Sequence, residues 1–241
     1  MGKRCAIFGA SGGIGRALVQ RLSASDEVDV VYAAARRPDA VPSGDRIRPV
    51  AMDLEDEESI AQAAAKMSAG GPLDLVIVAT GLLQRKPAVA PEKSWRAIDG
   101  EAMAEVLRIN TIGPALIGKH MLEHLDDKGS PVFAVISARV GSVEDNRLGG
   151  WHSYRASKAA LNQIMRNFTI ELGRRNKAAI VVSLHPGTVD TALSEPFQSN
   201  VPKGKLFTSD YSAACLLSVV KGLNAQDTGG FFAWDGKSIP F

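Results

Sequence analysis

The sequence has little net charge, few cysteines and no long apolar run. Its 28 Lys and Arg residues nearly balance 26 Asp and Glu residues, which gives a formal charge of +2. This balance predicts neither nucleic acid nor a membrane surface as a partner. No apolar run approaches the ~18 residues that a membrane-spanning helix needs. Cys5 and Cys215 fall in a predicted strand and a predicted helix, so we expect buried free thiols in a reducing compartment.

We expect no leader segment, and the sequence contains no complete metal-binding pattern. The first residues enter a predicted strand without an apolar leader, and we expect a cytoplasmic protein. His120 and His124 have an i, i+4 spacing that can bind zinc, but they lack the glutamate placed as in the metalloprotease pattern. We interpret both as surface histidines that suit the dipole near a helix C-terminus, and we predict no metal site.

What the sequence does contain is a regular alternation of strand and helix patterns. Near-continuous apolar strands predict a parallel sheet that is covered on both faces, and the alternation predicts one doubly wound domain. We expect an α/β, Rossmann-type, mostly parallel seven-stranded sheet with helices on both faces, in a single domain over residues 1–241. The expected strands are 3–8, 28–34, 47–51, 73–79, 132–136, 179–184 and 231–233, and the expected helices are 13–24, 57–67, 94–108, 111–125, about 154–175 and 209–222.

A glycine-rich turn over Gly9–Gly15 follows the first predicted strand and opens the first predicted helix. Glycines let such a turn close tightly and let backbone N–H groups approach a phosphate, while the helix N-terminus adds partial positive charge. An ordinary glycine-rich turn is the alternative. The position between strand and helix favours a cradle for a dinucleotide.

The second predicted strand ends at Arg36 without the acidic residue that would bind an adenosine ribose and indicate NAD. The guanidinium could instead pair with a 2′-phosphate, which predicts NADP(H). A solvated loop charge is the alternative. Ser11 could add a hydroxyl to the same phosphate. Asp53, after the third strand, could contact the adenine amino group or cap the next helix.

Tyr154 and Lys158 are four residues apart in a segment that reads as helix, so they share one face. A neighbouring ammonium favours the phenolate, and we expect it to lower the pKa of Tyr154 from ~10. Such a tyrosine could serve as a general acid and base. Together with the glycine turn, the pair predicts hydride transfer in which Tyr154 handles the proton.

These motifs and their order resemble the short-chain dehydrogenase/reductase family over nearly the whole chain. The resemblance lies in Gly9–Gly15, Asp53-Leu54, Ala79-Thr80-Gly81, Asn110, Ile136-Ser137, Tyr154-x3-Lys158 and Pro186–Thr191. The segments 150–162 and 229–236 look like the C-factor-like branch of that family.

The resemblance implies a role for each motif. Tyr154 would be the acid/base, and Lys158 would bind the nicotinamide ribose and ease proton transfer. Asn110 would hold a water, shape its helix and complete a proton relay. A serine at the end of the fifth strand would bind the substrate carbonyl. The residues expected to bind the cofactor are Gly9, Ser11, Gly13, Ile14, Gly15, Arg36, Asp53, Leu54, Ala79, Gly81, Tyr154, Lys158, Pro186, Gly187, Val189 and Thr191.

Two positions depart from the family pattern. The usual Asn-Ala-Gly after the fourth strand is Ala79-Thr80-Gly81. The usual Ser-Ser-x-x-Gly at the fifth strand begins Ser137-Ala138, so a gapless match puts Ala138 in place of the catalytic serine. One step along a strand reverses the side-chain direction. A bulge could restore Ser137, or Ser142 could serve; we predict Ser137.

The expected function is NADPH-dependent hydride transfer between the nicotinamide and a small carbonyl or alcohol substrate. A segment at about 188–207, broken by Pro and Gly, would cover that substrate. A cofactor-binding signalling or regulatory protein with little catalysis is the alternative from another class, and an epimerase or dehydratase is the alternative among enzymes. The resemblance also implies a homodimer or homotetramer, formed through long helices at about 94–125 and 154–175.

Overall fold

The protein is described by a computed structural model that covers residues 2–85, 87–202 and 204–241. Seven parallel strands form one sheet in the order β3-β2-β1-β4-β5-β6-β9. Every neighbouring pair in this sheet is parallel. The strands are β1 (Lys3–Phe8), β2 (Val28–Ala35), β3 (Ile47–Ala51), β4 (Leu75–Val78), β5 (Val132–Ile136), β6 (Ile180–His185) and β9 (Phe231–Ala233). The predicted doubly wound α/β fold is therefore confirmed.

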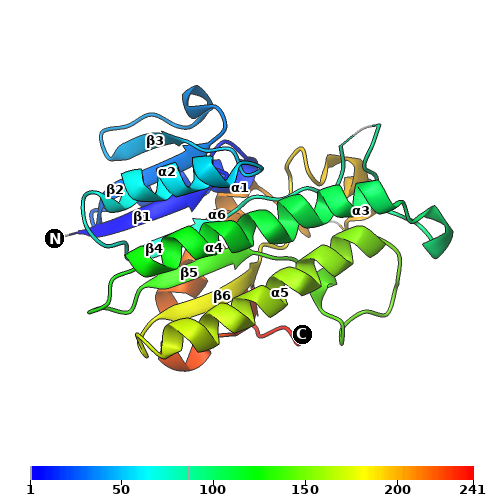
Figure 1. Ribbon diagram of the computed structural model, residues 1–241. Coiled ribbons are helices and arrows are strands. Elements are labelled where there is room, and N and C mark those ends of the chain that lie inside the picture. Colours follow the sequence, from blue (N-terminus) through cyan, green and yellow to red (C-terminus); the bar gives the residue numbers. More distant parts are fainter. Residues whose placement is uncertain (1, 86, 203) are drawn as a thin grey trace.

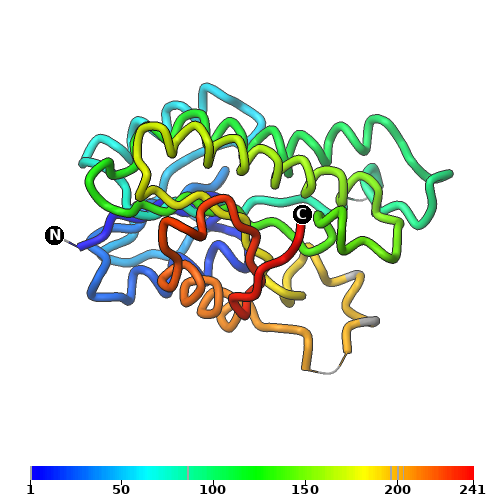
Figure 2. Tube along the Cα trace, turned by 90° about the horizontal axis from the view of Figure 1, so that it is seen from below, coloured from blue at the N-terminus to red at the C-terminus, as the bar shows by residue number. Residues whose placement is uncertain are grey.

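Helices cover both faces of the sheet. In Figure 1, α2, α4 and α5 lie in front of the strands, and Figure 2 shows α6 on the opposite side. The helices are α1 (Gly13–Ser23), α2 (Glu57–Ser68), α3 (Gly100–Leu107), α4 (Gly113–Met121), α5 (His152–Gly173) and α6 (Ser209–Gly222). No helix in the described part of the chain is both long and apolar enough to cross a membrane.

Alternate residues of each strand enter different cores, because successive side chains point to opposite faces of a sheet. Ile7 packs with residues of α1 and α6, whereas Phe8 packs with residues of α2, α4 and α5. Phe133 joins the second core and is fully buried. Burial of a side chain of this size stabilises the fold by roughly 1.5–3 kcal/mol. The continuous apolar character of the central strands thus reflects two cores rather than one.

The helices before β5 differ from the prediction in their bounds. The predicted helix at 94–108 begins at Gly100, where the Asp99 side chain accepts a hydrogen bond from the N–H of Ala102 and caps α3. Residues Trp95–Ala97 form a separate 3₁₀ turn, which Ser94 caps. Two capping residues within six positions explain why one helical pattern gives two elements.

A π turn at Arg108–Ile112 joins α3 to α4 without a break. The sequence predicted two separate helices here. The long element carries Asn110 on its irregular turn and extends beyond the sheet, next to the start of α5 (Figure 1). π turns of this kind are frequent at functional sites.

The segment after β6 is more regular than expected. β7 (Thr188–Val189) and β8 (Leu206–Phe207) pair in parallel and form a small second sheet. This pairing brings the two ends of the segment 188–207 together.

Candidate active site

A cleft with a volume of about 870 Å³ opens at the carboxyl ends of the central strands. Ligands of doubly wound sheets bind at this edge. A cavity of about 380 Å³ adjoins it and shares Gly12, Ala79, Thr80 and Gly81 with it. Of the predicted site residues, the cleft is lined by Gly13, Ile14, Ala79, Gly81, Ser137, Tyr154, Lys158, Pro186, Gly187, Val189 and Thr191, and the smaller cavity by Gly9, Ser11, Arg36, Asp53, Leu54, Ala79 and Gly81.

The glycine turn between β1 and α1 is shaped as a phosphate cradle requires. Gly9 has a φ of +82°, which favours glycine. A Cβ at Gly15 would lie 2.2 Å from the carbonyl oxygen of Gly9, so only glycine fits there. Helix α1 begins after Gly12 with no side-chain cap and no acidic residue in its first turn. An uncapped helix N-terminus attracts anions, and this one faces both cavities.

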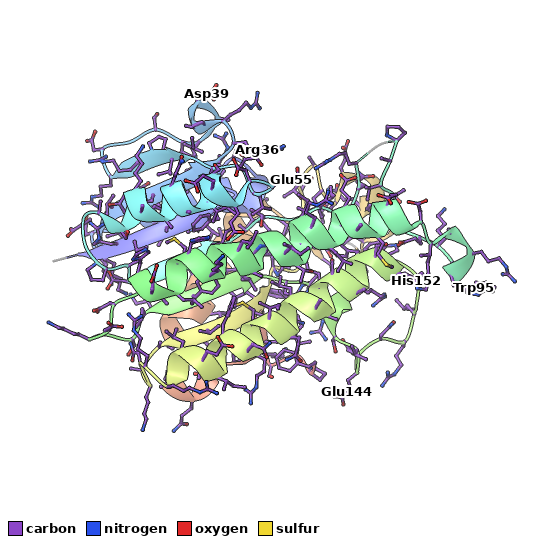
Figure 3. The ribbon with its side chains drawn as sticks, viewed as in Figure 1. Arg36, Asp39, Glu55, Trp95, Glu144 and His152 are labelled. Carbon is purple, nitrogen blue, oxygen red and sulfur yellow. The ribbon has the colours of Figure 1, made fainter. Side chains whose placement is uncertain are left out.

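The smaller cavity carries the residues predicted for the adenosine end. Arg36 is exposed, and Figure 3 shows it at the same corner of the sheet as Glu55. Oδ1 of Asp53 accepts a hydrogen bond from the N–H of Glu55 at 3.1 Å. Asp56, not Asp53, caps α2, so the helix-cap alternative for Asp53 is wrong. A guanidinium, a carboxylate and an open helix end in one cavity fit an adenosine group that carries phosphate.

Tyr154 and Lys158 face the cleft from one side of α5, as predicted. Nζ of Lys158 lies 5.9 Å from the ring centre of Tyr154 and donates a hydrogen bond to the carbonyl oxygen of Ile136 at 2.8 Å. Burial raises the pKa of Tyr154 to about 12 and lowers the pKa of Lys158 to about 8. The prediction that Lys158 lowers the pKa of Tyr154 is therefore wrong. Removal of both groups from water disfavours their charged forms and outweighs the attraction between them.

Ser137 directly follows β5 and lines the cleft. Its N–H donates to the carbonyl oxygen of Leu184 at 2.8 Å, so the backbone continues the sheet at this point. The hydroxyl of Ser142, by contrast, accepts a hydrogen bond from the N–H of Asp145 at 3.0 Å within a turn. Ser142 is not among the described residues that line the cleft. The geometry thus favours Ser137 as the predicted serine.

Three polar atoms at the cleft are buried without a hydrogen-bond partner in the described part of the chain. They are Oγ1 of Thr80, Oγ of Ser137 and Nδ1 of His185. Burial, reinforced by the positive charge of Arg139, lowers the pKa of His185 to about 4 and keeps the imidazole neutral. Buried polar groups almost always find partners. A ligand with polar groups would supply them here.

Asn110 lies behind the cleft wall rather than in it. Its side chain exchanges hydrogen bonds with the backbone N–H and carbonyl of Leu82, at 2.7 and 2.8 Å, and donates to the hydroxyl of Ser157 at 3.0 Å. A Cβ at Gly81 would lie 3.7 Å from Oδ1 of Asn110 and 3.9 Å from Nζ of Lys158. The amide therefore ties the loop after β4 to the helix that carries Lys158.

The loop after β6 forms the opposite wall. Gly187 has a φ of +79°, and a Cβ there would approach the ring of Phe207 to 2.6 Å. A Cβ at Gly13 would lie 2.6 Å from Cγ2 of Thr191. The start of α1 and the Pro186–Thr191 loop are thus in contact, as the predicted cofactor site requires.

Aromatic residues that the sequence offered for the pocket border and the substrate cover also line the cleft. Trp151 and Phe197 line it, with ring centres 5.1 Å apart. His185 lines it as well. Glu92 contacts the first residues of α5, near the position that Figure 3 marks with His152. Nothing around this glutamate in the sequence indicates such a contact. Within residues 2–85, 87–202 and 204–241, no three His, Cys, Asp or Glu side chains form a group that could hold a metal ion.

Known proteins share this sequence pattern and this fold. The sequence profile described as short chain dehydrogenase matches residues 3–202. An uncharacterized oxidoreductase of Schizosaccharomyces pombe is 29% identical over 255 residues and covers 98% of this chain and 96% of its own. C-signal of Myxococcus xanthus is 32% identical over 171 residues, which are 71% of this chain and 94% of its own.

A solved structure extends the similarity to three dimensions. The NADPH-bound carbonyl reductase from chicken fatty liver superimposes with a TM-score of 0.83 at 27% identity, covering 100% of this chain and 95% of that one. The resemblance inferred from the motifs, including that to the C-factor-like branch, is confirmed. The chain belongs to the short chain dehydrogenase family of oxidoreductases.

Proposed function

We propose that the protein is an NADPH-dependent carbonyl reductase that acts on small carbonyl compounds and is reversible as an alcohol dehydrogenase. The observation that carries this proposal is the convergence of Tyr154, Lys158 and the unpaired hydroxyl of Ser137 on one cleft with the glycine turn. The hydroxyl and the phenol would both donate hydrogen bonds to a substrate carbonyl oxygen and polarise it.

The protonation state of Tyr154 supports reduction near neutral pH. Because burial raises the pKa of its phenol to about 12, the side chain keeps its proton and can donate it to the oxygen of the reduced carbonyl. NADPH, when bound, supplies the hydride for the carbonyl carbon. Lys158, held by the carbonyl oxygen of Ile136, would stabilise the negative charge that remains on Tyr154 after the transfer.

The preference for NADP(H) rests on Arg36 and on the open start of α1. Arg36 lines the smaller cavity, where its guanidinium would pair with a 2′-phosphate. Gly12 lines both cavities and Gly13 lines the cleft, and their backbone would hold the pyrophosphate. A chain of 27% identity and the same fold is an NADPH-bound carbonyl reductase, which supports the same assignment.

We further propose one catalytic domain over residues 1–241, with the segment 188–207 as the substrate cover. Leu193, Phe197 and Val201 of that segment line the cleft. Exposed Ile98, Ile112 and Ile170 on or beside the long helices would be covered in a homodimer or homotetramer. The free thiols Cys5 and Cys215 suit a cytoplasmic location.

Tyr154→Phe tests this function. Removal of a general acid lowers kcat on the order of 10²–10⁴-fold, while the affinity for NADPH should stay at the parent value. The measurement is NADPH oxidation with a panel of ketones and aldehydes, together with NADPH titration by fluorescence.

Turnover by Tyr154→Phe at the parent rate would overturn the assignment. A parent protein that binds NADPH but oxidises it with no carbonyl would favour the cofactor-binding regulatory alternative. Conversion of substrate without net NADPH consumption would favour an epimerase or dehydratase.

A further inference from the structure

Glu92 is a charged residue that the fold buries, with 6% of its surface exposed. It lies in the loop between β4 and α3, next to Pro91 and Lys93, which line the cleft. A buried carboxylate is costly unless hydrogen bonds or positive charge compensate it. The hydrogen-bond partners of Glu92 therefore indicate its role.

Those partners are the first residues of α5. Both carboxylate oxygens of Glu92 accept a hydrogen bond from the N–H of Ser153 at 3.2 Å, and Oε1 also accepts one from the Ser153 hydroxyl. The carboxylate thus lies at a helix N-terminus, where the helix dipole favours negative charge. The residue before α5 is Trp151, which provides no side-chain cap of its own, so a residue 61 positions away from Ser153 supplies it.

The backbone of Glu92 also binds Trp151, the residue before α5. Its carbonyl oxygen accepts a hydrogen bond from the N–H of Trp151 at 2.6 Å. Trp151 has a φ of 51° and is the one non-glycine residue in the described part of the chain with a positive φ. Bulky side chains rarely adopt this conformation. Glu92 therefore fixes Trp151 by its backbone and Ser153 by its side chain, one residue on either side of the helix start.

This arrangement determines where two cleft side chains lie. The ring of Trp151 is 6.2 Å from the ring of Tyr154 and 5.1 Å from the ring of Phe197 on the cover segment. Tyr154 directly follows Ser153 in the first turn of α5. Glu92 is not among the residues that line the cleft, so it acts through these neighbours.

We propose that Glu92 is a positioning residue for carbonyl reduction: it clamps the start of α5 so that Trp151 forms the substrate wall and the Tyr154 hydroxyl meets the carbonyl oxygen. The inference rests on the proposed function. A displacement of about 1 Å in such a geometry costs on the order of 10²-fold in rate.

The test compares Glu92→Ala, Glu92→Gln and the control Glu101→Ala. Glu101 is an exposed glutamate in the first turn of α3, so its removal matches the change in charge at a helix start away from the cleft. The readouts are hydrogen exchange of the amides at 151–156, kcat and KM for carbonyl substrates well below the melting temperature, and NADPH affinity.

Glu92→Ala should speed amide exchange at the start of α5 and lower kcat on the order of 10²-fold, with NADPH affinity unchanged. Glu92→Gln keeps an acceptor for Ser153. It should therefore retain most of the parent kcat and most of the parent protection from amide exchange. Glu101→Ala should match the parent. In combination with Trp151→Gly, which has no strain at positive φ, the loss from Glu92→Ala should become smaller than in the parent background.

A Glu92→Ala variant that only melts earlier, with parent kcat and parent amide exchange, would overturn the inference and leave a purely structural cap. A parent protein that reduces no carbonyl would instead overturn the proposed function, and the kinetic part of the inference with it. An active parent with an unaffected Glu92→Ala overturns the inference alone.

Discussion

Helices α1 and α5 both begin at the same cleft, but only the N-terminus of α5 is capped by a side chain. α1 starts after Gly12 with no side-chain cap and no acidic residue in its first turn. α5 starts after a strained Trp151, and the buried carboxylate of Glu92 occupies its N-terminus. The two ends offer the same backbone N–H groups and the same dipole.

The difference shows how one physical feature serves two purposes. The open start of α1 leaves its partial positive charge for a ligand, which fits phosphate. At the start of α5 the partial positive charge is compensated by the Glu92 carboxylate, which holds the turn that carries Tyr154. Other helices follow the closed pattern with local caps, from Asp56 on α2, Asp99 on α3 and Thr208 on α6.

A side-chain cap introduced at the N-terminus of α1 should have the largest effect on cofactor binding. Gly12 has an extended backbone (φ −78°, ψ 165°), and a Cβ there would only touch the carbonyl oxygen of Gly9 at 3.4 Å. Gly12→Asp should therefore fold and cap the helix. Two like charges 4 Å apart repel by about 4 kcal/mol at an effective dielectric constant near 20, which weakens NADPH binding about 10³-fold.

Fluorescence titration of NADPH checks this result, and two variants separate its causes. Gly12→Asn supplies a neutral cap of similar size, and Gly12→Ala supplies neither cap nor charge. Both should bind NADPH better than Gly12→Asp. Equal affinity in the Asp and Asn variants would mean that α1 does not hold the phosphates.

The two serines near β5 should respond differently when their hydroxyls are removed. Ser137→Ala removes an unpaired hydroxyl from the cleft and should lower kcat by about 10²-fold, as loss of one donor to a developing oxyanion does. Ser142→Ala removes the acceptor for the N–H of Asp145 and should cost about 1 kcal/mol of stability without loss of turnover. Steady-state kinetics and urea denaturation of both variants distinguish them. The reverse assignment of losses would make Ser142 the functional serine.

Substitution of Arg36 tests whether the cofactor site extends from the start of α1 into the smaller cavity. Arg36→Ser should weaken NADPH binding about tenfold, equivalent to ~1.4 kcal/mol, because the exposed guanidinium is screened by water. Affinity for NADH should stay the same, since that cofactor has no 2′-phosphate. Arg37→Ser is the matched control, because Arg37 does not line the described cavity. If the Arg36 and Arg37 variants lose NADPH affinity equally, Arg36 has no specific phosphate contact.

The free energy of unfolding should depend on pH through Lys158 on α5. Burial lowers the pKa of Lys158 from 10.5 to about 8. Between these values the unfolded chain holds a proton that the folded chain does not, so the free energy of unfolding rises with pH, by at most about 1.4 kcal/mol per unit. Tyr154 acts in the opposite direction above pH 10, because its raised pKa keeps a proton that the unfolded chain loses.

Urea denaturation of the parent and of Lys158→Met between pH 8 and pH 10 measures the Lys158 contribution. The stability of the parent relative to the variant should increase across this range. The same slope in both proteins would contradict the burial of a neutral lysine.

Local sequence patterns predicted some site residues correctly, but they did not predict features that depend on burial or on the path of the backbone. The glycine spacing of Gly9–Gly15 and the pair Tyr154 and Lys158 identified both ends of the cleft, because these are local patterns with a fixed geometry. The choice between Ser137 and Ser142 depended on a backbone path that no local pattern reveals. The direction of the pKa shift of Tyr154 was predicted wrongly, since the spacing shows the neighbouring charge but not the depth of burial.

The order of strands and helices, the glycine-rich turn and the i, i+4 spacing of Tyr154 and Lys158 are all evident from the sequence alone. Each of these follows from side-chain periodicity and from the backbone freedom of glycine within a few residues. Three other features appear only in the folded chain: Glu92 caps α5, Trp151 adopts a left-handed conformation, and Lys158 is buried. Those features depend on segments far apart in the chain, and burial and long-range hydrogen bonds exist only once the segments pack together.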